Sequence, residues 1–440
     1  MKLFLDYKKL FSVILSLALL LTPGFFSYAQ VAQNLQNQID QRNLDIQNLE
    51  KEIASYQSEL DTIGQQKNSL ATSLKELDIT RKKLNADIAV TQKKIDKTNL
   101  KIKSLSSDIN TKQDTINNNI QSIAMGIVQT NEFEQSDIFN TLLSSKDLSV
   151  AWNDLENIAT IRETVRQDIV KLKQIKGELE STRKETISAK NELVSLKSEL
   201  NDQQKIVIQN TNEKNKLLKQ TKNSEANYQK LLASRIAQRD AFEKEIQDYE
   251  GQLQYILDPS KLPNAGVLSW PLQKVFVTQL FGKTVDSKRL YASGTHNGVD
   301  FRASVGTPVF AMADGTVLGV GDTDLTCYGA SFGKFIFIKY SNGLSSTFGH
   351  LSLIKVYEGQ QIKRGEMVGY SGNTGHTTGP HLHVSLYASE AVKMSSMPSA
   401  ACGGRIYRLP VAPVNAYLDA LYYLPSYTIS STLLNKKVSE

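Results

Sequence analysis

Residues 334–348 read KFIFIKYSNGLSSTF, and this stretch decides the fold of the C-terminal part of the chain. Apolar runs at 334–340 and 344–348 lie on either side of Asn342-Gly343. Asn-Gly between two such runs is typical of the tight turn of a β-hairpin, because both residues tolerate positive φ angles. The stretch therefore predicts two adjacent antiparallel strands.

Similar short apolar runs, separated by turn residues, fill the rest of this region. The other predicted strands are Lys274–Leu280, Thr307–Ala313, Thr316–Val320 and His381–Leu386. We therefore expect a mainly antiparallel β domain at residues 267–425, followed by a C-terminal tail at 426–440. The segment DPSKLPNAG at 258–266 contains two prolines and one glycine, which predicts a linker before the domain.

The histidines gather in the same region, because all five lie in the last third of the chain. His296 and Asp300 form the motif H-x-x-x-D, and His381 and His383 form H-x-H. Residues two apart in a strand project to the same face, so these two imidazoles can share one site. Two histidines and one aspartate can supply three zinc ligands and leave a fourth position for water, as catalytic zinc requires.

Either motif alone is weak, because histidines also occur as hydrogen-bonded members of a protein core. Their occurrence together in one β domain, with His350 between them, favours a metal site. Zinc lowers the pKa of bound water towards neutrality and polarises a carbonyl group, and peptide hydrolysis needs both effects. The residues therefore favour a zinc-dependent hydrolase.

Eight motifs, found in the same order, make residues 266–390 resemble the lysostaphin/LytM-type zinc endopeptidase family. The motifs are Trp270-Pro271, Thr278–Gly282, His296–Phe301, Gly306–Val309, Ala313–Val317, Phe348–Leu351, Gly372–Gly375 and Thr378–His383. Because they cover most of the predicted β domain, the resemblance implies a LytM-type peptidase domain.

The resemblance also implies a set of functional residues. One zinc ion per chain is expected on His296, Asp300 and His383, and catalytic roles are expected for His350 and His381 beside the metal. We assign His381 to orienting or deprotonating the attacking water and His350 to stabilising the oxyanion, although the two assignments can be exchanged. The implied substrate is the stem peptides or cross-bridges of peptidoglycan.

Two features depart from the family pattern. Val384-Ser385 follow the H-x-H motif where the family commonly has Phe-Glu, which affects a contact around a ligand but no ligand itself. Residues 322–332 look like a loop insertion that carries Cys327. Cys402 is the only other cysteine. In an exported chain this favours a Cys327–Cys402 disulfide, which would pin the insertion, over two unpaired thiols.

Apolar residues that recur every seven positions dominate residues 31–257, and no proline interrupts them. A sustained repeat of this kind keeps one apolar seam facing a partner helix and predicts a coiled coil. Two arms of nearly equal length, about 31–118 and 161–250, are separated by a less regular segment at about 119–163. The arms favour an antiparallel hairpin with that segment at its tip. A parallel dimer with one long broken rod is the competing interpretation.

A coiled-coil hairpin before a LytM-type domain resembles the EnvC-like subgroup, and Leu142–Leu148 loosely resembles its tip region. The resemblance implies that a membrane transporter-like complex at the division site holds the rod and controls access to the peptidase site. Some members of the subgroup have lost ligands and only activate other wall hydrolases. This chain keeps all five candidate residues, which favours an active peptidase over a non-catalytic activator or scaffold, and over a purely structural rod.

Residues 1–29 have the layout of a secretory signal peptide. Lys2, Lys8 and Lys9 precede the apolar run Leu10–Leu21, and small residues lie before a cleavage site after Ala29. If uncleaved, the segment would be a membrane anchor, and in both cases the rest of the chain lies in the periplasm or at the cell surface. A net charge of only +6 gives no case for binding nucleic acid. The sequence thus predicts an α+β multidomain protein, with a long antiparallel coiled-coil hairpin followed by a mainly antiparallel β LytM-type peptidase domain.

Overall fold

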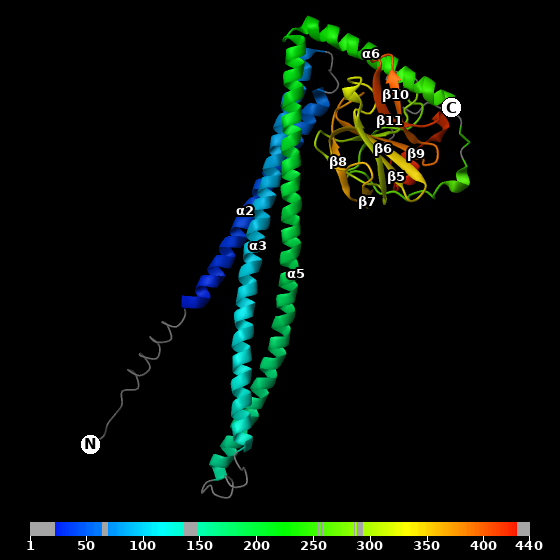
Figure 1. Cartoon of the computed structure of the whole chain (residues 1–440). Helices are drawn as coiled ribbons and strands as arrows, with labels where there is room; N and C mark the ends of the chain where they lie inside the picture. The colour runs from blue at the N-terminus through cyan, green and yellow to red at the C-terminus, as the bar shows by residue number, and fades with distance from the viewer. Residues whose placement is uncertain are drawn as a thin grey trace. The chain divides into compact units, whose positions relative to one another are not determined.

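The computed structural model (Figure 1) describes residues 23–428 except 64–68, 136–147, 254, 257, 286 and 288–293. The predicted signal peptide and C-terminal tail therefore fall largely outside the described residues. The chain forms two compact units, one made of residues 1–49 and 89–200 and the other of residues 50–88 and 201–440. Within the described ranges, no helix has a stretch that is both long and apolar enough to cross a membrane.

Long helices form the first part of the described chain. They are α2 (Pro23–Ile63), α3 (Leu70–Gln135), α5 (Leu148–Thr221) and α6 (Glu225–Gln252). In the first unit, Asp108 on α3 lies 3.1 Å from Thr182 on α5, and Ser122 lies 2.8 Å from Asp168. Residue numbers rise along α3 as their partners' numbers fall along α5. The predicted antiparallel coiled-coil hairpin is therefore confirmed.

The first predicted arm, about residues 31–118, contains more than one helix. It consists of two helices, α2 and α3, and these also run antiparallel to each other. Ion pairs of 3.0 Å join Asp45 to Lys93 in one unit and Glu59 to Lys75 in the other. Residues 64–68 (GQQKN), between the two helices, contain no apolar side chain.

The second arm also contains a break, and the tip differs from expectation. Lys222 and Asn223, between α5 and α6, have φ angles of 49° and 54°, which end the helix. Polar residues occupy the seam at this point. Little apolar contact is therefore available to hold the last turn of α5 and the first turn of α6 in one continuous helix. Conversely, α3 and α5 extend well into the predicted irregular tip at 119–163, because a single glycine does not interrupt a long helix. The rest of the tip, residues 136–147, lies outside the described residues.

The β-rich part contains one large antiparallel sheet with the strand order β1-β2-β9-β6-β5-β4-β7, in which β12 also pairs with β9, and β8 pairs with both β3 and β6. A separate hairpin is formed by β10 and β11. The strands are β1 (Val277–Gln279), β2 (Val299–Arg302), β3 (Pro308–Phe310), β4 (Gly315–Asp322), β5 (Lys334–Tyr340), β6 (Leu344–Ile354), β7 (Gln361–Ile362), β8 (Met367–Ser371), β9 (His381–Ala388), β10 (Lys393–Ser399), β11 (Arg405–Val411) and β12 (Tyr417–Leu418). Short helices are η1 (Pro259–Lys261), η2 (Thr323–Leu325), η3 (Val414–Ala416) and α8 (Ala420–Tyr423).

The hairpin predicted around Asn342-Gly343 is present as β5 and β6. Gly343 has a φ angle of 88°, a conformation that glycine adopts at little cost. Apolar side chains from the central strands, among them Phe301, Ile336 and Phe348, are fully buried in one core. All six predicted strands overlap observed ones. The limits of the predicted domains and of the linker at 258–266 stay predictions.

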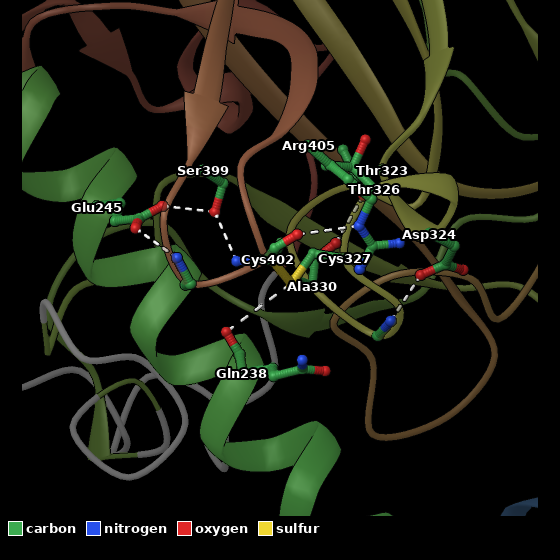
Figure 2. Close-up of a disulfide and its surroundings, with 12 residues drawn as sticks. Gln238, Glu245, Thr323, Asp324, Thr326, Cys327, Ala330, Ser399, Cys402 and Arg405 are labelled. Carbon is green, nitrogen blue, oxygen red and sulfur yellow. Dashed lines mark hydrogen bonds between the residues drawn. A yellow bond between two sulfur atoms is a disulfide. The ribbon is translucent and has the colours of Figure 1, made fainter.

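The predicted disulfide between Cys327 and Cys402 is present, with its Cα atoms 5.6 Å apart (Figure 2). It joins the loop insertion after β4 to the turn between β10 and β11. Figure 2 shows α6 beside this bond, where the carbonyl oxygen of Gln238 lies 3.9 Å from the sulfur of Cys327. The fully buried ring of Phe242, also on α6, packs into the same apolar cluster. The disulfide therefore forms part of the surface on which α6 rests.

Candidate metal centre and the cleft beside it

The pairing of β2 with β9 builds the centre. Their antiparallel register places Asp300 directly opposite His383, so the two side chains project from the same face of the sheet. His296 lies just before β2, and its backbone forms two hydrogen bonds with Gly282, of 2.8 and 3.0 Å. All three predicted ligand residues are therefore fixed by backbone pairing.

The ligand atoms of these three residues converge. Asp300 Oδ1 lies 2.9 Å from His383 Nδ1 and 3.2 Å from His296 Nε2, and the two ring nitrogens are 3.1 Å apart. The three side chains are buried, with at most 5% of each residue exposed. Ligand atoms about 2.0–2.1 Å from a tetrahedral zinc ion are roughly 3.3 Å from one another. The triangle thus has the size of one face of a zinc site.

The nitrogens that face away from the centre have partners of their own. His296 donates its Nδ1 proton to the carbonyl oxygen of Leu280 at 2.9 Å, so in the neutral ring Nε2 presents a lone pair to the centre. His383 Nε2 lies 2.8 Å from Ser385 Oγ, and a proton donated there leaves Nδ1 free for a metal. Ser385 occupies the position where the sequence departs from the family pattern, and it provides this contact with a hydroxyl group. The donor set fits a zinc ion.

Gly298 leaves room for one of these rings. A Cβ atom at this position would lie 2.5 Å from Cε1 and 2.6 Å from Nε2 of His383. Carbon atoms in contact are normally separated by about 3.5–4.0 Å, so any side chain here would displace the imidazole. The glycine of the His296–Phe301 motif therefore has a steric role in the centre.

Charge at the centre favours a cation. Burial would raise the pKa of Asp300, but the neighbouring His296 and His381 hold this pKa well below its usual value. Burial would lower the pKa of His296, but the carboxylate of Asp300 outweighs burial and raises it. Burial lowers the pKa of His383 despite the opposing effect of Asp300. An ionised carboxylate thus lies in an enclosed site, where its attraction for a cation is strong.

The two predicted catalytic histidines lie beside the ligands. Their ring centroids are 4.6 Å apart, and His381 Nε2 lies 3.6 Å from Asp300 Oδ1. His350 donates its Nδ1 proton to the carbonyl oxygen of Thr374 at 2.8 Å, and His381 donates its own to Gly379 at 2.7 Å. In their neutral forms both rings therefore present an unprotonated Nε2. The structure brings all five predicted site residues together.

His350 also has an unusual backbone. Its φ angle is 61°, a region that residues with side chains rarely adopt and that costs about 1–3 kcal/mol. Its backbone N–H donates a 2.7 Å hydrogen bond to the carbonyl oxygen of Phe332, which helps to hold this conformation. Burial lowers the pKa of His350 well below its usual value, and the nearby His381 and His383 add to this effect.

A family model described as Peptidase family M23 matches residues 294–394. This chain carries a peptidase family M23 domain. The matched range contains every histidine of the chain and both strands that carry the candidate ligands. The match thus covers the whole centre described above.

Known proteins resemble the M23 domain over a limited length. Peptidoglycan DD-endopeptidase ShyA of Vibrio cholerae is 42% identical over 91 residues, which cover 21% of this chain and 20% of that protein. DD-carboxypeptidase/endopeptidase Mpg of Neisseria meningitidis is 39% identical over 88 residues, which cover 20% of this chain and 19% of that protein. A zinc-containing peptidase from Vibrio cholerae, known from its crystal structure, is 25% identical, with coverage of 37% and 41% and a TM-score of 0.26. The chain spans only about a fifth of the length of the two curated relatives.

A cavity of about 250 Å³ lies beside the centre of the M23 domain. His350 and His383 line it from the centre, and Tyr417 lines it from β12. His376, in the loop before β9, also lines this cavity. The space next to the candidate ligands is therefore a cleft with polar groups on its walls.

One wall of the cleft comes from α6, which is far away in the sequence. Glu243 forms an ion pair with Nδ1 of His376. The carboxylate of Glu250 accepts hydrogen bonds from Tyr417 Oη at 2.7 Å and from the backbone N–H of Ala412 at 3.4 Å. Both carboxylates line the cavity that His350 and His383 also line.

Sequence reasoning missed Tyr417, Glu243 and Glu250. Ser385, named above as a departure from the family pattern, lies two residues after His383 on β9, so its contact with that ring follows from the strand period. Tyr417 and the two glutamates carry no motif, and the contacts that join the glutamates to His376, Ala412 and Tyr417 span more than 130 residues. No sequence signal pointed to them.

Proposed function

We propose that this chain is a zinc-dependent endopeptidase that hydrolyses peptide bonds in peptidoglycan stem peptides or cross-bridges. The observation that carries the proposal is the convergence of three buried ligand atoms, from His296, Asp300 and His383, beside two further imidazoles. The name of one relative, a peptidoglycan DD-endopeptidase, supports the substrate class. We place its action outside the cytoplasm, in wall remodelling or division.

His296, Asp300 and His383 would hold one zinc ion per chain. When bound, zinc supplies an acidified water molecule and polarises the scissile carbonyl group. His381 orients or deprotonates the attacking water through Nε2, and His350 stabilises the oxyanion once its own Nε2 has taken up a proton. Each ring can accept one proton on Nε2 and then donate it, since Nδ1 of each is already occupied by a carbonyl oxygen. Exchanging the two roles fits the same geometry.

The coiled coil is proposed to regulate the peptidase through a partner. Several apolar side chains near the tip of α3 and α5 are exposed, including Met125 at 62% and Trp152 at 70%. Exposed apolar groups of this size are typical of surfaces that contact another protein. A membrane transporter-like complex is the partner we propose. The loosely matching segment Leu142–Leu148 falls almost wholly outside the described residues. Export by the predicted signal peptide completes the proposal.

A non-catalytic activator or scaffold is the second candidate function. It is favoured by one observation, namely that side chains of α6 line the cleft and leave only a small cavity beside the centre. A chain with this arrangement can stimulate another wall hydrolase without itself cleaving peptide. The two functions differ in whether the activity of the chain requires the metal ligands. One experiment can decide between them.

The experiment compares the full chain with two variants on purified peptidoglycan in the presence of zinc. His296→Ala removes a candidate ligand. Phe242→Asp places a charge at the fully buried contact of α6 with the disulfide surface, and so displaces the helix. We expect mass spectrometry to detect new peptide ends with Phe242→Asp, and to detect none when His296→Ala is added or zinc is chelated. New ends that persist in both controls would contradict the proposal.

A further inference from the structure

Two carboxylates of α6 reach into the cleft from one face of the helix. Glu243 and Glu250 are seven residues apart, which is about two helical turns or roughly 10 Å along the axis. Both line the same cavity as His350 and His383. The helix therefore presents two acidic groups, at a defined spacing, to the cleft beside the centre.

The groups that receive these carboxylates belong to the M23 domain, matched over residues 294–394, and to the segment that follows it. His376 lies in the loop before β9 and pairs with Glu243. Tyr417 lies on β12, which pairs with β9, and it donates its hydroxyl proton to Glu250 together with the N–H of Ala412. Both receiving positions are thus built next to the strand that carries His383.

The attachment of α6 does not by itself require acids in the cleft. Glu245 on the same helix accepts hydrogen bonds from Ser399 Oγ at 2.6 Å and from Ala401 N–H at 2.8 Å, beside the disulfide and outside the cavity (Figure 2). Phe242 adds a fully buried apolar anchor at the same surface. Burying a further carboxylate without a cation is unfavourable. Among the described residues, Glu250 forms no ion pair, so its position calls for another explanation.

We propose that His376, and Tyr417 with the N–H of Ala412, are two carboxylate-binding positions of the substrate cleft. Glu243 and Glu250 occupy them in place of the free carboxylates of an acidic peptide. The inference rests on the proposed peptidase function and specifies its substrate as a peptide with two free carboxylates. It also makes α6 a direct competitor of that substrate.

The test measures binding rather than cleavage, with the full chain kept free of zinc by a chelator. The probes are a synthetic cross-linked stem peptide with free carboxylates and the same peptide with every carboxylate amidated. Calorimetry is performed on the chain with Glu243→Ala and Glu250→Ala, which vacates both positions. We expect the acidic peptide to bind at least about tenfold more tightly than the amidated one, because each hydrogen bond to a charged group contributes strongly.

Further substitutions in the variant with Glu243→Ala and Glu250→Ala identify the residues that cause the preference for the acidic peptide. Tyr417→Phe and His376→Gln should each reduce the preference for the acidic peptide several-fold and leave binding of the amidated peptide unchanged. Glu245→Ala is the matched control, because it weakens the attachment of α6 outside the cavity and should leave the preference intact. Unchanged melting curves verify that each variant is folded.

Equal binding of the two peptides, or a preference that survives both Tyr417→Phe and His376→Gln, would overturn the inference. Its failure can be told apart from failure of the proposed function. Cleavage of peptidoglycan without a carboxylate preference contradicts only the two binding positions. A carboxylate preference that depends on Tyr417 and His376, in a chain that never cleaves, contradicts only the peptidase function.

Discussion

Asp300 and His383 face each other across the β2–β9 pair, with Asp300 Oδ1 2.9 Å from His383 Nδ1. The two residues are 83 positions apart in the sequence. Because the register of two central strands sets their distance, the centre is part of the sheet and forms when the sheet forms. Residues that support this pair should therefore affect metal affinity even when they are not ligands.

Ser385→Ala tests the support of a ligand ring. It removes the hydroxyl group 2.8 Å from Nε2 of His383, and loss of such an outer partner typically costs about 10–100-fold in metal affinity. Competition titration with a chromogenic zinc chelator measures the change. Ser389→Ala is the control, because that hydroxyl group contacts Ser345 instead of a candidate ligand. An unchanged zinc affinity in Ser385→Ala would show that this contact does not support the metal.

Gly298→Ala tests the steric account of the same ring. The added methyl group would lie 2.5 Å from Cε1 of His383, so the imidazole must move away from Asp300. We expect zinc content to fall well below one ion per chain, and overpacking to destabilise the fold by about 1–3 kcal/mol. Gly177→Ala, on a helix with no atom near the new Cβ, should lower neither the zinc content nor the stability of the fold. Full zinc content in Gly298→Ala would argue against the steric role.

Replacing both cysteines by serine tests the role of the disulfide. The bond closes a separation of 75 residues, and its loss should lower the free energy of unfolding by about 2–4 kcal/mol. Denaturant titration with and without a reductant measures the effect. Reductant should destabilise the wild-type chain and leave the variant with Cys327→Ser and Cys402→Ser unchanged. If reductant has no effect on the wild type, the bond does not stabilise this fold.

The attachment of α6 should depend on pH through Glu250. Burial raises the pKa of Glu250 from its ordinary value of 4.5 to about 7 in the folded chain. The contribution of the protonated Glu250 carboxyl group to the free energy of unfolding is complete below about pH 4.5. It is lost as the pH rises to about 7, because the unfolded chain releases this proton first. The phenols facing Glu250 stay neutral throughout, since burial raises the pKa of Tyr407 to about 12 and raises those of Tyr387 and Tyr417 further.

Thermal unfolding of the wild type and of Glu250→Gln between pH 4 and pH 8 measures this dependence. The stability of the variant relative to the wild type should rise over that range, because glutamine has no proton to lose. A difference that stays constant with pH would contradict the assignment to Glu250.

Local sequence patterns predicted those parts of the molecule that depend on nearby residues. The β5–β6 hairpin follows from Asn342-Gly343, and the shared face of His381 and His383 follows from the two-residue period of a strand. The coiled-coil helices follow from the heptad repeat, whereas their antiparallel orientation was favoured by the nearly equal lengths of the two arms. The repeat did not predict where the helices end, since the seam weakens gradually and the ends depend on what each helix packs against.

The cleft could not be predicted in the same way. Glu250 meets Tyr417 across a separation of 167 residues, and no local period relates the two positions. A weak apolar seam along α6 gave no indication that Phe242 would pack beside the disulfide. Contacts of this kind arise only when the helix and the β domain are placed together, so they became visible with the structure.

The central claim is that His296, Asp300 and His383 hold one zinc ion. Zinc analysis of the purified full chain, combined with X-ray absorption spectroscopy, tests it most directly. We predict one zinc ion per chain with two nitrogen ligands and one carboxylate ligand from the protein, and loss of zinc in His296→Ala, Asp300→Ala and His383→Ala variants that remain folded. A folded wild-type chain that binds no zinc, or bound zinc that none of the three substitutions affects, would contradict the account.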